Sequence, residues 1–87
     1  MKPPALREWR LVTRIDCHLC EEMAAVLESG LGPRGLAWTE VDVDSDPELR
    51  SRYGDTVPVL LRDGRAVAKV RLDPGLLRRL IAGGTWT

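Results

Sequence analysis

Two cysteines separated by two residues, between a strand-like segment and a helix-like segment, constrain this chain more than any other feature. The motif is Cys17-His18-Leu19-Cys20. Residues 8–15 before it alternate loosely between polar and apolar, whereas the residues after it repeat with the period of a helix. A Cys-x-x-Cys motif in this position is typical of a redox pair. We therefore expect both thiols at the N-terminus of a helix.

The helix that follows is expected to bury one cysteine better than the other. At about 100° per residue its apolar side chains form one stripe that faces the core. Cys20 lies on the edge of this stripe, and Cys17 lies about 120° from its centre. Thiol–disulfide exchange needs this asymmetry, with an exposed attacker and a sheltered partner. The members of the stripe are Leu19, Met23, Val26 and Leu27.

Length and charge narrow the possible functions. The 87 residues allow one domain, residues 1–87 with a core of about 8–82. Thirteen basic residues balance thirteen acidic ones, which argues against binding to nucleic acid or a membrane surface. No apolar run is long enough for a transmembrane helix or a signal peptide. We expect a cytoplasmic monomer, in which two cysteines are not a structural framework.

The first half of the chain predicts a strand, a helix and a second strand. Apolar residues at both odd and even positions of residues 8–15 indicate a strand that is covered on both faces. The helix begins near Cys17 and ends at Gly30, a suitable residue beyond a helix C-terminus. Residues 36–43 then alternate cleanly, which favours a half-exposed strand at a sheet edge.

The second half predicts a short helix, a hairpin and a last helix. The short helix begins either with a Ser45–Glu48 capping box or with Asp46 before a proline, and it ends at Gly54. Asp63-Gly64 between two strand-like runs signals a two-residue hairpin. Asp73 precedes a proline and should cap the last helix. That helix has four apolar residues on one face and two glycines at its end: Leu76, Leu77, Leu80, Ile81, Gly83 and Gly84.

The resulting order is βαβαββα, an α/β fold in which one mixed sheet of four strands is flanked by helices on both faces. With the Cys-x-x-Cys motif and the segment Thr56-Val57-Pro58, this order resembles the thioredoxin fold, and most closely the small glutaredoxin-like proteins. The resemblance extends from Trp9 to Ala82. It implies the strand order second, first, third, fourth. It also implies a cis peptide bond before Pro58 and places this proline opposite the cysteines.

The resemblance also assigns residues to substrate binding. Arg14 stands where glutaredoxins usually carry a lysine that holds a carboxylate of glutathione. The backbone of Thr56-Val57-Pro58 would pair with an extended substrate, and Asp73 would keep one contact to glutathione. Two departures weaken this match. The residues between the cysteines are His-Leu rather than Pro-Tyr, and Val70-Arg71 replace a Gly-Gly pair. We therefore expect weak recognition of glutathione.

Each candidate residue also has a plain structural interpretation. His18 is either an imidazolium that stabilises the Cys17 thiolate or a solvated side chain without influence. Arg14 is either an anion contact or a solvated charge at a strand end. A zinc site needs four ligands, and Cys17, Cys20 and His18 supply three at most, so no bound metal or cofactor is expected. The large aromatic residues are expected to pack: Trp9, Trp38 and Tyr53.

These observations predict a thiol–disulfide oxidoreductase of the glutaredoxin-like group that serves cell redox homeostasis. Cys17 would be the nucleophile, because a helix N-terminus and the Cys-x-x-Cys spacing lower a thiol pKa from about 8.5 to about 3.5–7.5. Cys20 would be the resolving thiol. The substrate would be a protein or low-molecular-weight disulfide, with glutathione as the candidate reductant. The alternative is a thioredoxin-fold binding module whose cysteines hold a partner or metal without turnover.

Overall fold

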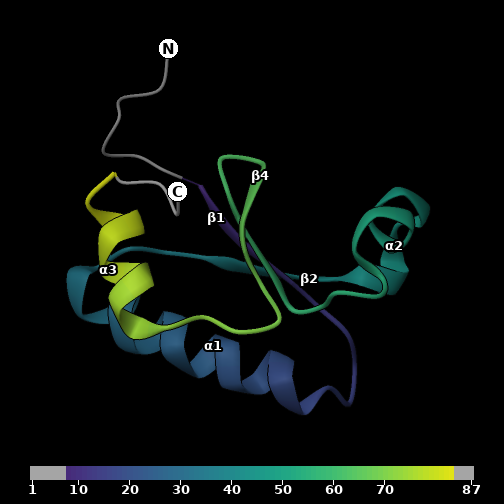
Figure 1. The fold of residues 1–87 in the computed structure, drawn as a ribbon, viewed down its shortest axis with the longest axis horizontal. Coiled ribbons are helices and arrows are strands. Elements are labelled where there is room, and N and C mark those ends of the chain that lie inside the picture. Colours follow the sequence, from purple (N-terminus) through teal and green to yellow (C-terminus); the bar gives the residue numbers. More distant parts are fainter. Residues whose placement is uncertain (1–7, 84–87) are drawn as a thin grey trace.

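The computed structural model describes residues 8–83, which form one mixed sheet with helices on both faces (Figure 1). The predicted order of elements is confirmed, with two additional 3₁₀ turns. The strands are β1 (Trp9–Thr13), β2 (Thr39–Asp42), β3 (Val59–Arg62) and β4 (Arg65–Lys69). The helices are α1 (His18–Leu31), α2 (Pro47–Tyr53) and α3 (Pro74–Ile81), and the turns are Gly32–Arg34 and Val43–Ser45.

The four strands lie in the order β2-β1-β3-β4, which the resemblance implied. β1 and β2 are parallel, and their register pairs Thr13 with Asp42. β3 is antiparallel to both β1 and β4. Because β1 and β2 run in the same direction, the segments that leave their C-terminal ends emerge at one edge of the sheet. The cysteine motif follows β1 at this edge.

β1 is buried on both faces, as predicted from its apolar residues at both odd and even positions. Leu11 and Val12 are adjacent in sequence and both are fully buried. Successive side chains of a strand point to opposite faces, so each of the two serves a different core. Leu11 belongs to a cluster beneath α1 and α3, and Val12 belongs to a cluster on the α2 side.

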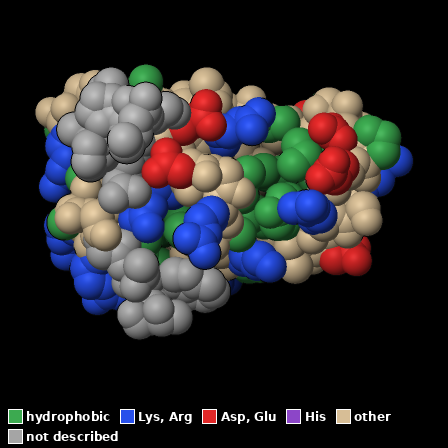
Figure 2. All heavy atoms as spheres, turned by 90° about the horizontal axis from the view of Figure 1, so that it is seen from above, with side chains coloured by type: hydrophobic (Ala, Val, Ile, Leu, Met, Phe, Trp, Pro, Cys, Tyr) green, Lys and Arg blue, Asp and Glu red, His purple; other side chains and the backbone are tan. Residues whose placement is uncertain are grey.

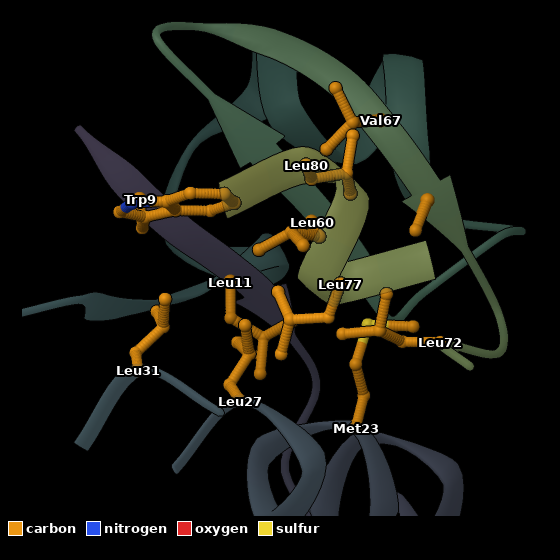
Figure 3. Packing of buried hydrophobic residues seen from close by; sticks show 11 residues of the cluster. Trp9, Leu11, Met23, Leu27, Leu31, Leu60, Val67, Leu72, Leu77 and Leu80 are labelled. Carbon is orange, nitrogen blue, oxygen red and sulfur yellow. The ribbon is translucent and has the colours of Figure 1, made fainter. Parts of the chain in front are cut away.

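The larger cluster joins α1 and α3 to one face of the sheet (Figure 3). Leu27 and Leu31 point from α1 toward Leu11 of β1, whereas Met23 points toward Leu72. Leu77 of α3 packs in the same cluster. Burying each such side chain contributes about 1.5–3 kcal/mol, which fixes α1 on the sheet. Partly buried residues extend this cluster at its margin: Ala24, Val26, Leu36, Trp38, Leu76 and Ile81.

A smaller cluster lies on the opposite face of the sheet, where α2 packs. Leu49 and Tyr53 of α2 contact a group of four buried residues on this face. In the space-filling view, hydrophobic side chains gather in the middle of the visible face, with Lys and Arg side chains around them (Figure 2). The three aromatic residues named from the sequence all pack against one of the two clusters. The buried members of the smaller cluster are Val12, Val43, Val59 and Leu61.

Two local sequence signals are realised, one as a hydrogen bond and one as turn geometry. Asp46, not the Ser45–Glu48 box, starts α2, because its Oδ1 accepts from the Glu48 N–H at 2.8 Å. Ser45 instead donates to a backbone carbonyl. Asp63 and Gly64 both have positive φ, 53° and 82°, as a two-residue hairpin of the expected type requires.

Several predicted element bounds are wrong, and β1 covers Trp9–Thr13 rather than residues 8–15. The strand expected over residues 36–43 is formed only by Thr39–Asp42. Leu36 N–H donates instead to the Leu31 carbonyl, and Val43 begins a 3₁₀ turn. α1 does not stop at Gly30 but continues to Leu31. The tail Thr85-Trp86-Thr87, the chain start and Gly84 lie outside the described residues.

Gly30 is required by packing rather than by helix termination. A Cβ at this position would lie 2.5 Å from Cδ2 and 3.3 Å from Cγ of Leu77, a buried side chain of α3. The absence of a side chain therefore allows α1 and α3 to approach each other closely.

We expect Gly30→Ala to destabilise the protein by about 1–2 kcal/mol, because overpacking costs about 1–3 kcal/mol and the better helix propensity of Ala returns up to about 1 kcal/mol. Urea denaturation measures the change in the free energy of unfolding. The control is the same substitution in a Leu77→Ala background, where the space is open and Ala should be neutral or stabilising. An equal loss in both backgrounds would show that Leu77 is not the obstacle.

Candidate redox site

The site begins where β1 ends and α1 starts. Asp16 adopts a left-handed conformation with φ of 58°, which Asp tolerates better than most residues. This turn delivers Cys17 to the N-cap position of α1. Its Sγ accepts a hydrogen bond from the backbone N–H of Cys20 at 3.2 Å, and its carbonyl accepts from Glu21 N–H at 3.1 Å. The first turn of the helix thus donates toward the Cys17 sulfur.

Cys17 and Cys20 are joined in a disulfide, with their Cα atoms 5.2 Å apart. Cys20 is 4% exposed and belongs with the buried residues of α1, whereas Cys17 is only half-buried. The burial asymmetry that the helical angles predicted is therefore present. Ile15, two residues before Cys17, is 74% exposed and adds an apolar side chain to this surface.

His18 points along the surface of α1. Its Nε2 lies 3.3 Å from Oε2 of Glu22 one turn later, and its side chain is 86% exposed. The contact available to the imidazole is therefore a carboxylate on the solvent side of the helix. Of the two interpretations of His18, this geometry favours the solvated side chain.

Arg14 is engaged within the protein. Its Nε donates to Oδ2 of Asp44 at 3.0 Å and its Nη2 to Oδ1 at 3.2 Å, a bidentate pair. Its Nη1 donates to the carbonyl of Gly54 at 2.9 Å. Arg14 therefore ties the segment before the cysteines to the two ends of the α2 region. In this state three of its donors serve the fold and are not directed at a substrate carboxylate.

Asp44 is the centre of a small charged network. Arg50 donates to the same carboxylate through Nε at 3.1 Å and to the Asp44 carbonyl through Nη2 at 3.1 Å. The hydrogen bond from Arg14, together with the charges of both arginines, holds the pKa of Asp44 below its ordinary value of 3.8. The same pairing raises the pKa of Arg14.

The segment Thr56-Val57-Pro58 leads into β3, and its Val57–Pro58 peptide bond is cis, as the resemblance implied. Thr56 donates to the Tyr53 carbonyl through its N–H at 2.9 Å and through Oγ1 at 3.4 Å. The Pro58 carbonyl accepts from Val70 N–H at 2.7 Å. The proline segment and the loop after β4, which are distant in sequence, are therefore joined directly.

Val70 stands where the glutaredoxin pattern has a glycine, and the backbone conformation of Val70 is unusual. Its φ is 68°, and the Arg71 N–H donates across it to the Lys69 carbonyl at 2.7 Å, closing a three-residue γ-turn. A β-branched residue rarely adopts positive φ. Val70 is also 38% exposed. Asp73 caps α3 by accepting from Leu76 N–H at 3.1 Å, so its carboxylate serves the helix.

Two hollows flank the N-terminal half of α1. One, of about 460 Å³, reaches both cysteines and is bounded by the end of β1 and by β2. The other, of about 90 Å³, lies between α1 and the loop that contains Val70. Arg14 and the cysteine pair line the first hollow together. Val70 and Arg71 line the second together with Leu19 and Glu22.

Residues 8–83 contain no group of three or more His, Cys, Asp or Glu side chains that could hold a metal ion. In the same part of the chain, no helix has the length and apolar character needed to cross a membrane.

Comparison with known families decides the classification. The model of the glutaredoxin-like domain family (DUF836) matches residues 9–82. The chain belongs to this family. It is 35% identical over 81 residues to an uncharacterized protein of Mycobacterium tuberculosis, an alignment that covers 87% of this chain and 84% of that one. The family match accounts for nearly all of the described residues.

Solved structures agree with this assignment. A structural genomics protein of X. campestris superposes with a TM-score of 0.73 at 34% identity, covering 87% of this chain and 97% of its own. A mutant thioredoxin of Halobacterium salinarum superposes with a TM-score of 0.63 at 29% identity, covering 94% of this chain and 77% of its own. This glutaredoxin-like chain therefore has a thioredoxin-like fold with a disulfide-bonded Cys-x-x-Cys pair.

Sequence reasoning missed the partner of Arg14. The local pattern around Asp44 predicts no contact with Arg14, but the expected sheet topology does carry a usable signal. Once β1 and β2 are taken as parallel, the residues after both strands emerge at the same edge. Thr13 pairs with Asp42, so a carboxylate two residues beyond Asp42 comes within reach of Arg14.

We expect Asp44→Asn to lower the free energy of unfolding at neutral pH, by an amount that depends on pH. The folded pKa of Asp44 is lowered, so its contribution is present above about pH 4 and is lost as the pH falls through the folded pKa. Urea denaturation from pH 7 to pH 2 should therefore show the two proteins converging in acid. Glu48→Gln, at an exposed pair with Arg52, is the control with a smaller effect at pH 7. A difference that does not change with pH would contradict the assignment.

Proposed function

We propose that this protein is a thiol–disulfide oxidoreductase with a dithiol mechanism, in which Cys17 is the nucleophile and Cys20 the resolving thiol. One observation carries the proposal. The disulfide lies at the N-terminus of α1 with Cys17 accessible and Cys20 buried. Family membership supports the same chemistry.

The local geometry suits a stabilised thiolate at Cys17 in the reduced protein. The unpaired N–H groups and the positive end of the α1 dipole lie at its sulfur, and the Cys20 N–H already donates to this atom. Such surroundings lower the pKa of a thiol. The Cys17 thiolate attacks a substrate disulfide and releases one substrate thiolate. The Cys20 thiolate then attacks Sγ of Cys17 in the mixed disulfide, which releases the second substrate thiolate and restores the Cys17–Cys20 disulfide.

Turnover requires a reductant for the Cys17–Cys20 disulfide. Glutathione is the reductant that the family resemblance suggests, and we propose that this chain recognises it weakly. Arg14 is held by Asp44 and the Gly54 carbonyl. Val70 and Arg71 occupy the loop where a Gly-Gly pair would let a backbone approach closely. A protein disulfide or another small thiol is then the better exchange partner.

We expect Cys20→Ser to trap a substrate that Cys17→Ser does not. The first variant keeps the attacking thiol but lacks the group that releases it, so a model disulfide should leave a stable adduct that mass spectrometry detects. The second variant keeps only a buried thiol. Its alkylation rate should follow a pKa near that of a free thiol, about 8.5, whereas Cys17 should titrate lower.

Redox titration of the unmodified protein completes this test. A disulfide that forms and breaks reversibly in thiol buffers, with repeated turnover of a model substrate, supports catalysis. Equal trapping by both variants would contradict the assignment of Cys17 as attacker and Cys20 as resolving thiol. A pair that exchanges once and never turns over would point to a binding module instead.

In a glutathione-coupled assay with a small mixed disulfide, we expect low activity that rises when Val70 and Arg71 are both replaced by Gly. One recovered backbone contact is worth about 1 kcal/mol, or roughly five-fold. Replacing both by Ala is the matched control, because it removes bulk without giving the backbone of glycine. A wild-type rate equal to that of an ordinary dithiol glutaredoxin, measured side by side, would refute weak recognition.

A further inference from the structure

The larger hollow beside the disulfide has a distinctive charge. It has a volume of about 460 Å³ and is the one of the two flanking hollows that reaches both cysteines. Three carboxylates and one guanidinium line it. A molecule that approaches the disulfide from this side therefore places its substituents among acidic groups. The lining residues are Thr13, Arg14, Ile15, Asp16, Cys17, Cys20, Glu21, Ala24 and Glu40.

The negative charge of the three carboxylates in the hollow is not neutralised by the basic side chain of the lining. Arg14, the one guanidinium of the lining, is already paired with Asp44, which lies just outside it. Within residues 8–83 no ion pair joins a basic side chain to Asp16, Glu21 or Glu40. The three carboxylates therefore act on whatever enters the hollow.

The opposite flank of α1 provides an internal comparison. The smaller hollow there is lined by one acidic and one basic side chain, Glu22 and Arg71, among apolar residues. Its charges balance, so it exerts little selection by charge. Of these two hollows, the one that reaches Cys17 and Cys20 has the excess of acidic side chains in its lining. A concave site lined by one sign of charge concentrates ligands of the opposite sign and repels those of the same sign.

We propose that this hollow selects positively charged exchange partners, that is, small aminothiols, their disulfides and cysteines within basic peptides, over anionic thiols. The inference rests on the exchange activity proposed above and names its substrate class. In the step concerned, the thiolate of an aminothiol attacks Sγ of Cys17, an S–S bond forms between them, and Cys20 leaves as a thiolate. A second aminothiol thiolate then attacks the mixed disulfide, releasing the aminothiol disulfide and the Cys17 thiolate. Two electrons pass from two thiols to the protein.

The test compares three small thiols that differ in charge: cysteamine, 2-mercaptoethanol and 2-mercaptoethanesulfonate. Each reduces the oxidised protein under pseudo-first-order conditions, with acid quenching and mass analysis of alkylated cysteines. Each rate is divided by the rate of the same thiol with uncharged 4,4′-dithiodipyridine, which removes differences in intrinsic nucleophilicity. At about 10 mM ionic strength we expect the cationic thiol to be favoured over the anionic one about five- to ten-fold. At 1 M salt, where the Debye length is about 3 Å, the ratio should approach one.

A double variant, Glu21→Gln with Glu40→Gln, tests whether the carboxylates of the hollow cause the preference for the cationic thiol. Both thiols attack the same disulfide, so their ratio cancels any change in the leaving ability of Cys20. We expect this ratio to fall to about two or less at low salt. Glu28→Gln with Glu48→Gln removes the same charge outside the hollow and should leave the ratio within about two-fold of the wild type.

The outcomes separate the two proposals. If no thiol of any charge reduces the pair reversibly, the oxidoreductase assignment fails. If all three exchange with equal normalised rates at low salt, exchange stands and charge selection is refuted. An equal fall of the ratio in both double variants would also refute the hollow as the cause, since net charge alone would then explain it.

Discussion

The packing of one helical stripe on one face of the sheet determines the rest of this site. Met23, Leu27 and Leu31 pack in one cluster with the two inner strands, β1 and β3, and this sets the rotation of α1 about its axis. The same rotation places Cys20 inward and leaves Cys17 at the rim of the helix N-terminus. The chemistry of the pair therefore follows from apolar contacts made up to about three turns away. No residue between the cysteines is needed to create the asymmetry.

The charged network around Asp44 has a separate role from the apolar core. It joins the end of β1, the start of the α2 region and the Gly54 carbonyl through hydrogen bonds of Arg14. A lysine at this position would offer one compact ammonium, whereas arginine offers a planar set of donors that reaches several acceptors at once. Arg14 uses this set of donors within the fold, on Asp44 and on the Gly54 carbonyl. This is consistent with a site that does not rely on anionic groups of its substrate.

Much of the fold could be predicted because its signals are local. Asp46 and Asp63-Gly64 specify a helix start and a hairpin by their own hydrogen-bonding and turn preferences, whatever surrounds them. The burial asymmetry of the cysteines follows from helical geometry alone. The helix end predicted at Gly30 is wrong, because the sequence does not distinguish a glycine that ends a helix from one that lets a neighbouring helix approach closely. The backbone conformation of Val70 could not be predicted, because nothing in the sequence indicates positive φ for a β-branched residue.

Glu40 also lies on a strand that a second copy of the molecule would meet if it paired with the sheet. It lies within β2, a four-residue strand at one end of the sheet order. The outer backbone groups of such a strand are a template for pairing with another chain, and a charged residue on it discourages this. In an antiparallel pair of two β2 strands with Glu40 opposite Glu40, like charges would lie side by side and destabilise the pair. One side chain thus belongs both to the lining of the hollow beside the disulfide and to the strand at the end of the sheet.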